Sequence, residues 1–255
     1  MYNEDDVFKG NLQPYEDPLR YDEKNDPFTK DIAFFKKWAS KKSGPVVELA
    51  CGTGRVTIPL AKSGIHMMGV DIHPGMLKRA EEKGKENNVS ISFLEQDCCA
   101  LCLPVQTDFM FMTGNSFQHF LTNDSQDLLL QAVKEHLVKG GIFVFGTRFA
   151  QTEELREEVK ETVHEKKGNT EITYELTERY DALNQVLYCE TDTLIKGEVV
   201  DVDRIKLRYV FPQELKRLLD ANGFKLKELY GDWDETPLAA NSTNIVVVCE
   251  KKESQ

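Results

Sequence analysis

The sequence predicts an α/β fold: a doubly wound, mostly parallel seven-stranded sheet that carries an inserted small antiparallel β-sheet. Three observations indicate this. Before residue 150, apolar runs of strand length alternate with segments of helical periodicity. A glycine-rich turn at residues 48–55 follows the first apolar run. Between residues 150 and 210, polar and apolar residues alternate instead. Alternating strands and helices indicate a parallel sheet covered on both faces.

The core strands are expected to be short apolar runs, and the helices between them have one apolar face. We expect strands at residues 45–50, 66–71, 91–96, 108–113, 141–147, 224–232 and 243–250. We expect helices at residues 31–39, 54–63, 75–87, 124–138 and 211–223. In the last helix, Pro212 suits the first turn and Gly223 lies just past the end.

The chain is expected to contain two parts. Residues 1–149 and 211–255 form the core, and residues 150–210 form the insert. The insert is expected to hold one polar helix followed by three antiparallel strands. The helix is predicted from Leu155, Val159 and Val163, and the strands from alternation near 172–176, 186–195 and 200–209. An odd shift of the apolar phase in the last strand predicts a bulge or bend near Asp203.

The turn after the first strand has the features of a nucleoside site. Gly52 and Gly54 have no Cβ, so the chain can turn sharply and a ligand can touch bare backbone. Asp71 ends the next apolar run and can bind both hydroxyls of a ribose through charge-assisted hydrogen bonds. A dinucleotide loop has a third small residue where this chain has Thr57, and the loop is not a phosphate cradle either. A nucleoside without phosphate is therefore favoured.

These residues resemble the class I S-adenosylmethionine-dependent methyltransferases. Residues 48–54 match the first motif, with Ala50 where many members have glycine. Residues 67–80, 93–98 and 108–119 resemble the second, third and fourth motifs in order, and residues 140–145 the fifth strand. The resemblance implies a Rossmann-like fold with an antiparallel final hairpin. It also implies S-adenosyl-L-methionine as the cofactor and a transferase activity.

The resemblance further implies a set of cofactor-binding residues. In this family the acidic residue of the second motif, here Asp71, binds the ribose, and the apolar residue after it packs on adenine. An acidic side chain and the following amide of the third motif, here Asp97 and Cys98, read the adenine edge. The full set that we expect is Glu48, Ala50, Gly52, Gly54, Arg55, Asp71, Ile72, Met76, Asp97, Cys98 and Asn115.

The insert resembles the lid sheet of methyltransferases that act on small amines, such as sugar N,N-dimethyltransferases and glycine N-methyltransferases. A decorative or dimerising sheet is the alternative. We expect a small-molecule acceptor, methylated at an amine nitrogen or a hydroxyl. Candidate catalytic residues are His119, a neutral imidazole able to accept a proton, and Tyr21, in a segment that resembles the closing N-terminal segment of these families. Arg148 is a candidate for holding an acceptor carboxylate.

Other chemistries use related folds. Aminopropyl transfer would need a carboxylate-rich loop after the fourth strand, and residues 114–119 contain no carboxylate. A non-catalytic adenosyl-binding protein is a further alternative. A nicotinamide oxidoreductase is disfavoured by Thr57.

Composition restricts the partners. The net charge of −11 over 255 residues repels polyanions, so we expect no nucleic acid partner. No apolar run nears the ~18 residues of a membrane span, and the acidic start differs from a signal peptide, so we expect a cytoplasmic protein without a membrane partner. A monomer or homodimer is expected. Cys99 and Cys102 have the spacing of half a zinc site, but the other half is missing, so no metal is expected.

Overall fold

The structure is a computed structural model that describes residues 11–156 and 158–253. Internal contacts divide the chain into two compact units. The core unit contains residues 15–149 and 210–253, and the insert unit contains residues 11–14 and 150–209. Residues 11–14 join the insert unit because Asn11 and Gln13 donate side-chain hydrogen bonds to the backbone of its last strand. Among the described residues, no helix has the length and apolar character needed to cross a bilayer.

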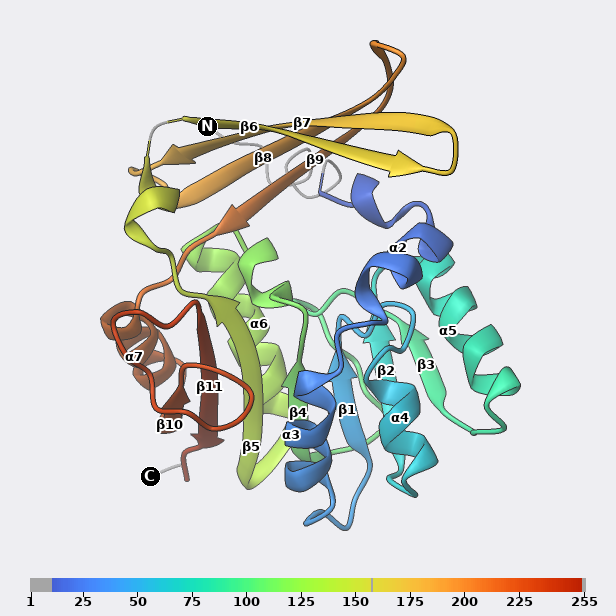
Figure 1. The fold of residues 1–255 in the computed structure, drawn as a ribbon. Coiled ribbons are helices and arrows are strands. Elements are labelled where there is room, and N and C mark those ends of the chain that lie inside the picture. Colours follow the sequence, from blue (N-terminus) through green and yellow to red (C-terminus); the bar gives the residue numbers. More distant parts are fainter. Residues whose placement is uncertain (1–10, 157, 254–255) are drawn as a thin grey trace. The chain divides into compact units, whose positions relative to one another are not determined.

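The core unit is built on a seven-stranded sheet (Figure 1). The strands lie side by side in the order β10, β11, β5, β4, β1, β2 and β3. Their bounds are Val46–Leu49 (β1), Met67–Asp71 (β2), Ser92–Glu95 (β3), Thr107–Met112 (β4), Leu137–Arg148 (β5), Phe224–Tyr230 (β10) and Asn244–Lys251 (β11). Strands β1 to β5 are parallel, and β11 is antiparallel to both β5 and β10. The predicted sheet, including its final antiparallel hairpin, is confirmed.

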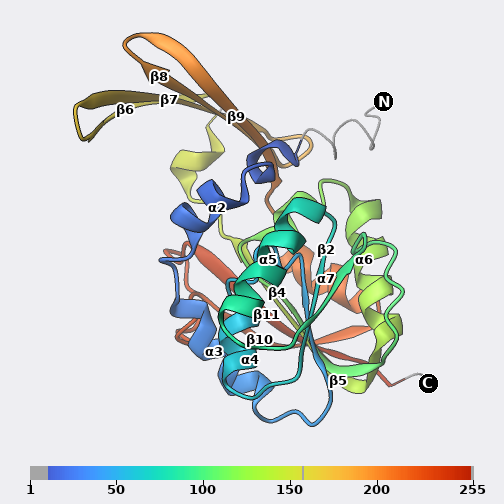
Figure 2. The same ribbon diagram turned by 90° about the vertical axis from the view of Figure 1, so that its right-hand side faces the viewer.

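Helices cover both faces of this sheet (Figure 2). Their bounds are Pro18–Asn25 (α2), Lys30–Ala39 (α3), Thr57–Lys62 (α4), Pro74–Glu86 (α5), Asn123–His136 (α6) and Pro212–Ala221 (α7). One apolar cluster contains Phe35 of α3 and Leu60 of α4. A second cluster contains Leu129 of α6 and Leu215 of α7. Because residues of β5 alternate between the two clusters, the sheet is buried on both sides, as a doubly wound fold requires.

Two predicted boundaries in the core unit differ from the structure. The helix expected from residue 54 begins at Thr57, because the left-handed backbone of Gly54, with a φ of 79°, still belongs to the turn. The strand expected from residue 141 begins at Leu137. Helix α6 therefore ends at His136, two residues earlier than expected, and its C-cap residue Leu137 is already extended.

The insert unit contains a four-stranded antiparallel sheet in sequence order. Its strands are Val159–Lys167 (β6), Thr170–Asp181 (β7), Val186–Ile195 (β8) and Glu198–Arg208 (β9). The polar helix predicted around Leu155, Val159 and Val163 is wrong, because Val159 begins β6, which pairs with β7 along its whole length. A spacing of four residues suits one face of a helix, but it also suits one face of a strand, where every second residue shares a face.

Strand register locates the bulge and orients the aromatic side chains of the insert. The bulge lies around Val200, between the pairs Thr193–Asp201 and Leu194–Val199, and not near Asp203. Tyr174 and Tyr188 lie on opposite faces of the sheet. Tyr174 pairs with Thr193, so these two residues share a face. Thr193 and Tyr188 are five positions apart on β8, and residues an odd number apart on a strand lie on opposite faces.

Candidate active site

The turn after β1 and the end of β2 lie together at the carboxyl edge of the sheet. Leu49 pairs with Val70, so Ala50 and Asp71 follow on adjacent strands. The φ angles of Ala50, Gly52 and Gly54 are 51°, 54° and 79°, which are left-handed conformations. Glycine adopts this conformation freely, whereas Ala50 is strained there. The turn is therefore tight, and it brings the Gly52 amide to Asp71.

Asp71 organises the backbone of this turn. Its Oδ2 atom accepts a 2.7 Å hydrogen bond from the Gly52 amide, and its Oδ1 atom accepts a 2.9 Å hydrogen bond from the His73 amide. The side chain is buried, and burial raises the pKa of Asp71 above its ordinary value, although the two backbone hydrogen bonds oppose the shift. The carboxylate is therefore held rigidly, with lone pairs left to accept further hydrogen bonds.

The two glycines of the turn face different neighbours. A Cβ atom at Gly52 would lie 3.3 Å from Met76 Cε and 3.8 Å from the Cε1 and Oη atoms of Tyr21. A Cβ atom at Gly54 would lie 3.0 Å from Ile58 Cδ1. The bare backbone of Gly52 therefore faces side chains of α2 and α5, whereas Gly54 allows close packing of α4.

Glu48 and Thr57 form a buried pair beneath the turn. The Thr57 hydroxyl donates to Glu48 Oε2, and the Thr113 hydroxyl donates to Glu48 Oε1 at 3.3 Å. Burial raises the pKa of Glu48 to about 8, while the hydrogen bond from Thr57 opposes the shift. Thr57, which occupies the place of a third glycine, thus holds the acidic side chain of the first motif. A cofactor contact of Glu48 stays a prediction.

Arg55 joins the turn to the N-terminal helices. Its guanidinium makes a two-pronged ion pair with Asp31, with hydrogen bonds of 2.8 Å and 2.6 Å. It also donates a 2.7 Å hydrogen bond to the carbonyl of Phe28. These partners engage the head group within the protein, so the structure supports a positioning role, and the predicted cofactor contact of Arg55 stays untested.

The other predicted cofactor residues lie in the loops that follow β2, β3 and β4. Ile72 is half-buried directly after Asp71. Asp97 is exposed, and its Oδ1 atom accepts the Cys99 amide at 2.8 Å. Cys98 is buried, and burial raises the pKa of its thiol. Asn115 is left-handed, with a φ of 59°, in the turn after β4. All of these loops leave the sheet at its carboxyl edge, where ligands of open α/β sheets bind.

The structure brings Tyr15 to His119, a contact that the sequence analysis missed. Tyr15 Oη and His119 Nε2 lie 2.9 Å apart, and the Tyr15 ring is also 5.7 Å from that of Tyr21. Burial lowers the pKa of His119 to about 4 and raises the pKa of Tyr21 to about 12. Burial also raises the pKa of Tyr15 well above its usual range. All three side chains are therefore neutral near pH 7.

Arg148, the candidate for holding an acceptor carboxylate, is the last residue of β5. Its role stays a prediction.

Comparison with known proteins agrees with this architecture. Residues 46–141 match the family described as Methyltransferase domain. The putative methyltransferase YqeM of Bacillus subtilis is 24% identical over 218 residues, which cover 84% of this chain and 86% of that protein. The solved structure of the CcbJ methyltransferase from Streptomyces caelestis is 25% identical with a TM-score of 0.77, and the match covers 88% of this chain and 95% of that chain. The sugar N-methyltransferase KedS8 from Streptoalloteichus sp has the same fold, at 18% identity and a TM-score of 0.65, over 91% of this chain and 93% of that chain.

Other relatives match over shorter stretches and have other names. A putative protein N5-glutamine methyltransferase of Methanocaldococcus jannaschii is 41% identical over 73 residues, which are 28% of this chain and 37% of that relative. This chain therefore spans little more than a third of that relative's length. Further relatives are named carboxy-S-adenosyl-L-methionine synthase and 23S rRNA methyltransferase. These relatives are named for different substrates and products.

The fold and the matched domain define a methyltransferase of class I architecture. Residues 46–141 of the chain are a methyltransferase domain, as the motifs predicted. The predicted cofactor, S-adenosyl-L-methionine, is the one with which a glycopeptide N-methyltransferase of the same fold, 20% identical to this chain, has been crystallised.

Proposed function

We propose that this enzyme methylates a small molecule, at an amine nitrogen in preference to a hydroxyl. The contact between Tyr15 and His119 carries this proposal. A histidine with a pKa of about 4 is a weak base, so it cannot readily take the proton of a hydroxyl. A neutral amine needs no such base, because its own lone pair is already nucleophilic. His119 therefore orients the acceptor, and the base role predicted from sequence becomes secondary.

The turn and Asp71 fit an adenosyl group. Asp71 is buried, rigid and still able to accept hydrogen bonds, so it would hold the ribose hydroxyls. The bare backbone at Gly52 and the side chains of Ile72 and Met76 would contact the nucleoside, and the backbone amide of Cys98 would read the adenine edge. When bound, S-adenosyl-L-methionine supplies a methyl group activated by a sulfonium charge. The protein positions the acceptor and excludes water.

A small acceptor is also supported by charge and by fold. The net charge of −11 disfavours a nucleic acid substrate, because a polyanion would be repelled. The fold is shared with enzymes named as a sugar N-methyltransferase and a glycopeptide N-methyltransferase.

We further propose that residues 150–210 serve acceptor recognition. The predicted nucleoside motifs all lie before residue 120, so cofactor binding does not need the insert. An oligomerisation role is the alternative proposal for the same sheet.

An acceptor screen tests the proposal. Amines, phenols and a ribosomal RNA fragment are incubated with the enzyme and S-adenosyl-L-methionine, and homocysteine release is measured after enzymatic hydrolysis of the product. We expect turnover with an amine. With that acceptor, His119→Ala should lower activity and leave S-adenosylhomocysteine affinity unchanged by calorimetry. His66→Ala is the matched control, because His66 is exposed and directly precedes β2, at the end of that strand away from Asp71. Turnover of RNA alone would refute a small acceptor, and turnover of hydroxyl compounds alone would refute the preference for nitrogen.

A further inference from the structure

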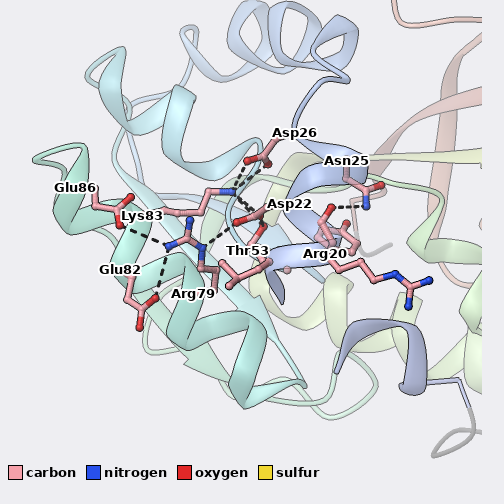
Figure 3. A network of polar contacts seen from close by, with 12 residues as sticks. Arg20, Asp22, Asn25, Asp26, Thr53, Arg79, Glu82, Lys83 and Glu86 are labelled. Carbon is pink, nitrogen blue, oxygen red and sulfur yellow. Dashed lines mark hydrogen bonds and ion pairs between the residues drawn. The ribbon is translucent and has the colours of Figure 1, made fainter. Parts of the chain in front are cut away.

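A network of charged side chains fastens α2 to the glycine turn and to α5 (Figure 3). At its centre is Asp22, which is buried although it is charged. Its carboxylate accepts hydrogen bonds from Thr53 Oγ1 at 2.6 Å, Lys83 Nζ at 2.7 Å and Arg79 Nε at 2.9 Å. Burial alone would raise the pKa of Asp22, but the hydrogen bonds from these three partners lower it by more. The pKa of Asp22 is therefore below its ordinary value. Asp22 is therefore held as a carboxylate.

The position of Asp22 in α2 gives this network a consequence for the turn. Tyr21 and Asp22 are consecutive, and so are their partners Gly52 and Thr53. Asp22 binds the Thr53 hydroxyl while the Tyr21 ring stands 3.8 Å from the place of a Cβ atom at Gly52. The ionic contacts of Asp22 therefore hold the Tyr21 ring on the bare backbone of the turn.

This arrangement covers the part of Gly52 that a cofactor is proposed to touch. Tyr21 and Met76 both stand within van der Waals range of the open side of Gly52. A ligand that reaches this backbone from that side meets the Tyr21 ring, which α2 carries. Moving α2 away from the turn would separate the Asp22 carboxylate from Lys83 and Arg79.

We propose that Asp22 is the latch of a gate formed by α2, and that this latch sets the rate at which the cofactor exchanges. This inference rests on the proposed cofactor site at Gly52 and Asp71. It makes Asp22 a positioning residue, since it acts through Tyr21 and through Thr53. Weakening the latch should raise the population of the open state in both the free and the bound protein. Association and dissociation should therefore both become faster.

The test measures binding kinetics of S-adenosylhomocysteine on the immobilised full-length protein by surface plasmon resonance. Asp22→Asn keeps an oxygen for Thr53 but removes the charge that faces Lys83 and Arg79. We expect both rate constants to rise by on the order of tenfold, as for the loss of a charged hydrogen bond. The dissociation constant should then change less than either rate. Amide hydrogen exchange of α2 in the ligand-free variant should also become faster.

Two further variants sharpen the test. Lys83→Met should reproduce the effect, and the double variant should be no faster than the faster single variant, because both changes break one interaction. Glu82→Gln is the matched control, because Glu82 contacts Arg79 at 3.6 Å and no hydrogen bond or ion pair joins it to α2 among the described contacts. If Asp22→Asn does not fold, Lys83→Met carries the test. Melting temperatures establish that each variant is folded.

The outcomes separate the gate from the proposed site. Unchanged rates in Asp22→Asn and Lys83→Met would overturn the latch, and so would an equal effect of Glu82→Gln. Faster dissociation with unchanged or slower association would also overturn it, because Asp22 would then stabilise the complex instead of closing a gate. If the wild-type protein does not bind S-adenosylhomocysteine at all, the proposed cofactor site fails.

Discussion

Asp71→Asn gives the sharpest test of the cofactor site. Two backbone amides, of Gly52 and His73, donate to the two oxygens of Asp71. Asp71→Ala would leave both amides without their acceptor, at a cost of about 1–3 kcal/mol each. A loss of affinity in that variant could therefore come from a loss of stability. Asparagine keeps one oxygen for one amide, removes the charge and places an NH2 group, itself a donor, against the other amide.

The expected change in stability is small because two effects oppose each other. Losing one hydrogen bond lowers the free energy of unfolding. However, the pKa of Asp71 is raised by burial, so the folded protein favours the protonated form and loses stability as the pH rises through that pKa. At neutral pH the buried charge is therefore a net cost, which asparagine does not carry. We expect the free energy of unfolding to change by no more than about 1 kcal/mol.

The expected change in binding is large. Hydrogen bonds from ribose hydroxyls to a charged acceptor contribute about 1.5–3 kcal/mol, so the affinity for S-adenosylhomocysteine should fall by roughly ten- to hundredfold. Calorimetry measures the affinity, and urea unfolding measures the stability. Asp97→Asn is the control, because Asp97 is exposed and the Cys98 amide can still read adenine, so its affinity should fall less. An unchanged affinity in folded Asp71→Asn would refute the assignment, and a loss of stability without a loss of affinity would make Asp71 purely structural.

Two further predictions concern pH and the insert. The pKa of Glu48 is raised by burial from an ordinary value of 4.5 to about 8, so the stability that protonated Glu48 provides is lost as the pH rises through this range. The free energy of unfolding of the wild-type protein should therefore fall more steeply with pH over this range than that of Glu48→Gln. Urea unfolding at several pH values measures both. If the two proteins showed the same dependence on pH, the buried, protonated state of Glu48 would be contradicted. Replacing residues 150–209 with a short Gly/Ser linker should leave S-adenosylhomocysteine affinity nearly intact but abolish methyl transfer to the acceptor found by screening. Full activity of the folded truncation would instead favour an oligomerisation role, and loss of cofactor binding would mean that the insert supports the core.

The sequence by itself determined the core fold and the location of the candidate site. Strands and helices alternate along the chain, and consecutive parallel strands end at the same edge of the sheet. The pairing of β1 with β2 therefore places the turn at Gly52 next to the carboxylate of Asp71. In the structure, the Gly52 amide donates a hydrogen bond to Asp71. The motifs also predicted the class of enzyme, which the matched domain confirms.

The tertiary structure alone decided the contacts between residues distant in sequence. Tyr15 and His119 are 104 positions apart, and Asp22 and Lys83 are 61 positions apart, so no local pattern could reveal either pair. The secondary structure of Val159 and Val163 was also decided by tertiary contacts. Their spacing fits a helix and a strand equally well, and the choice was made by pairing with β7, which satisfies the backbone hydrogen bonds of β6 along one edge.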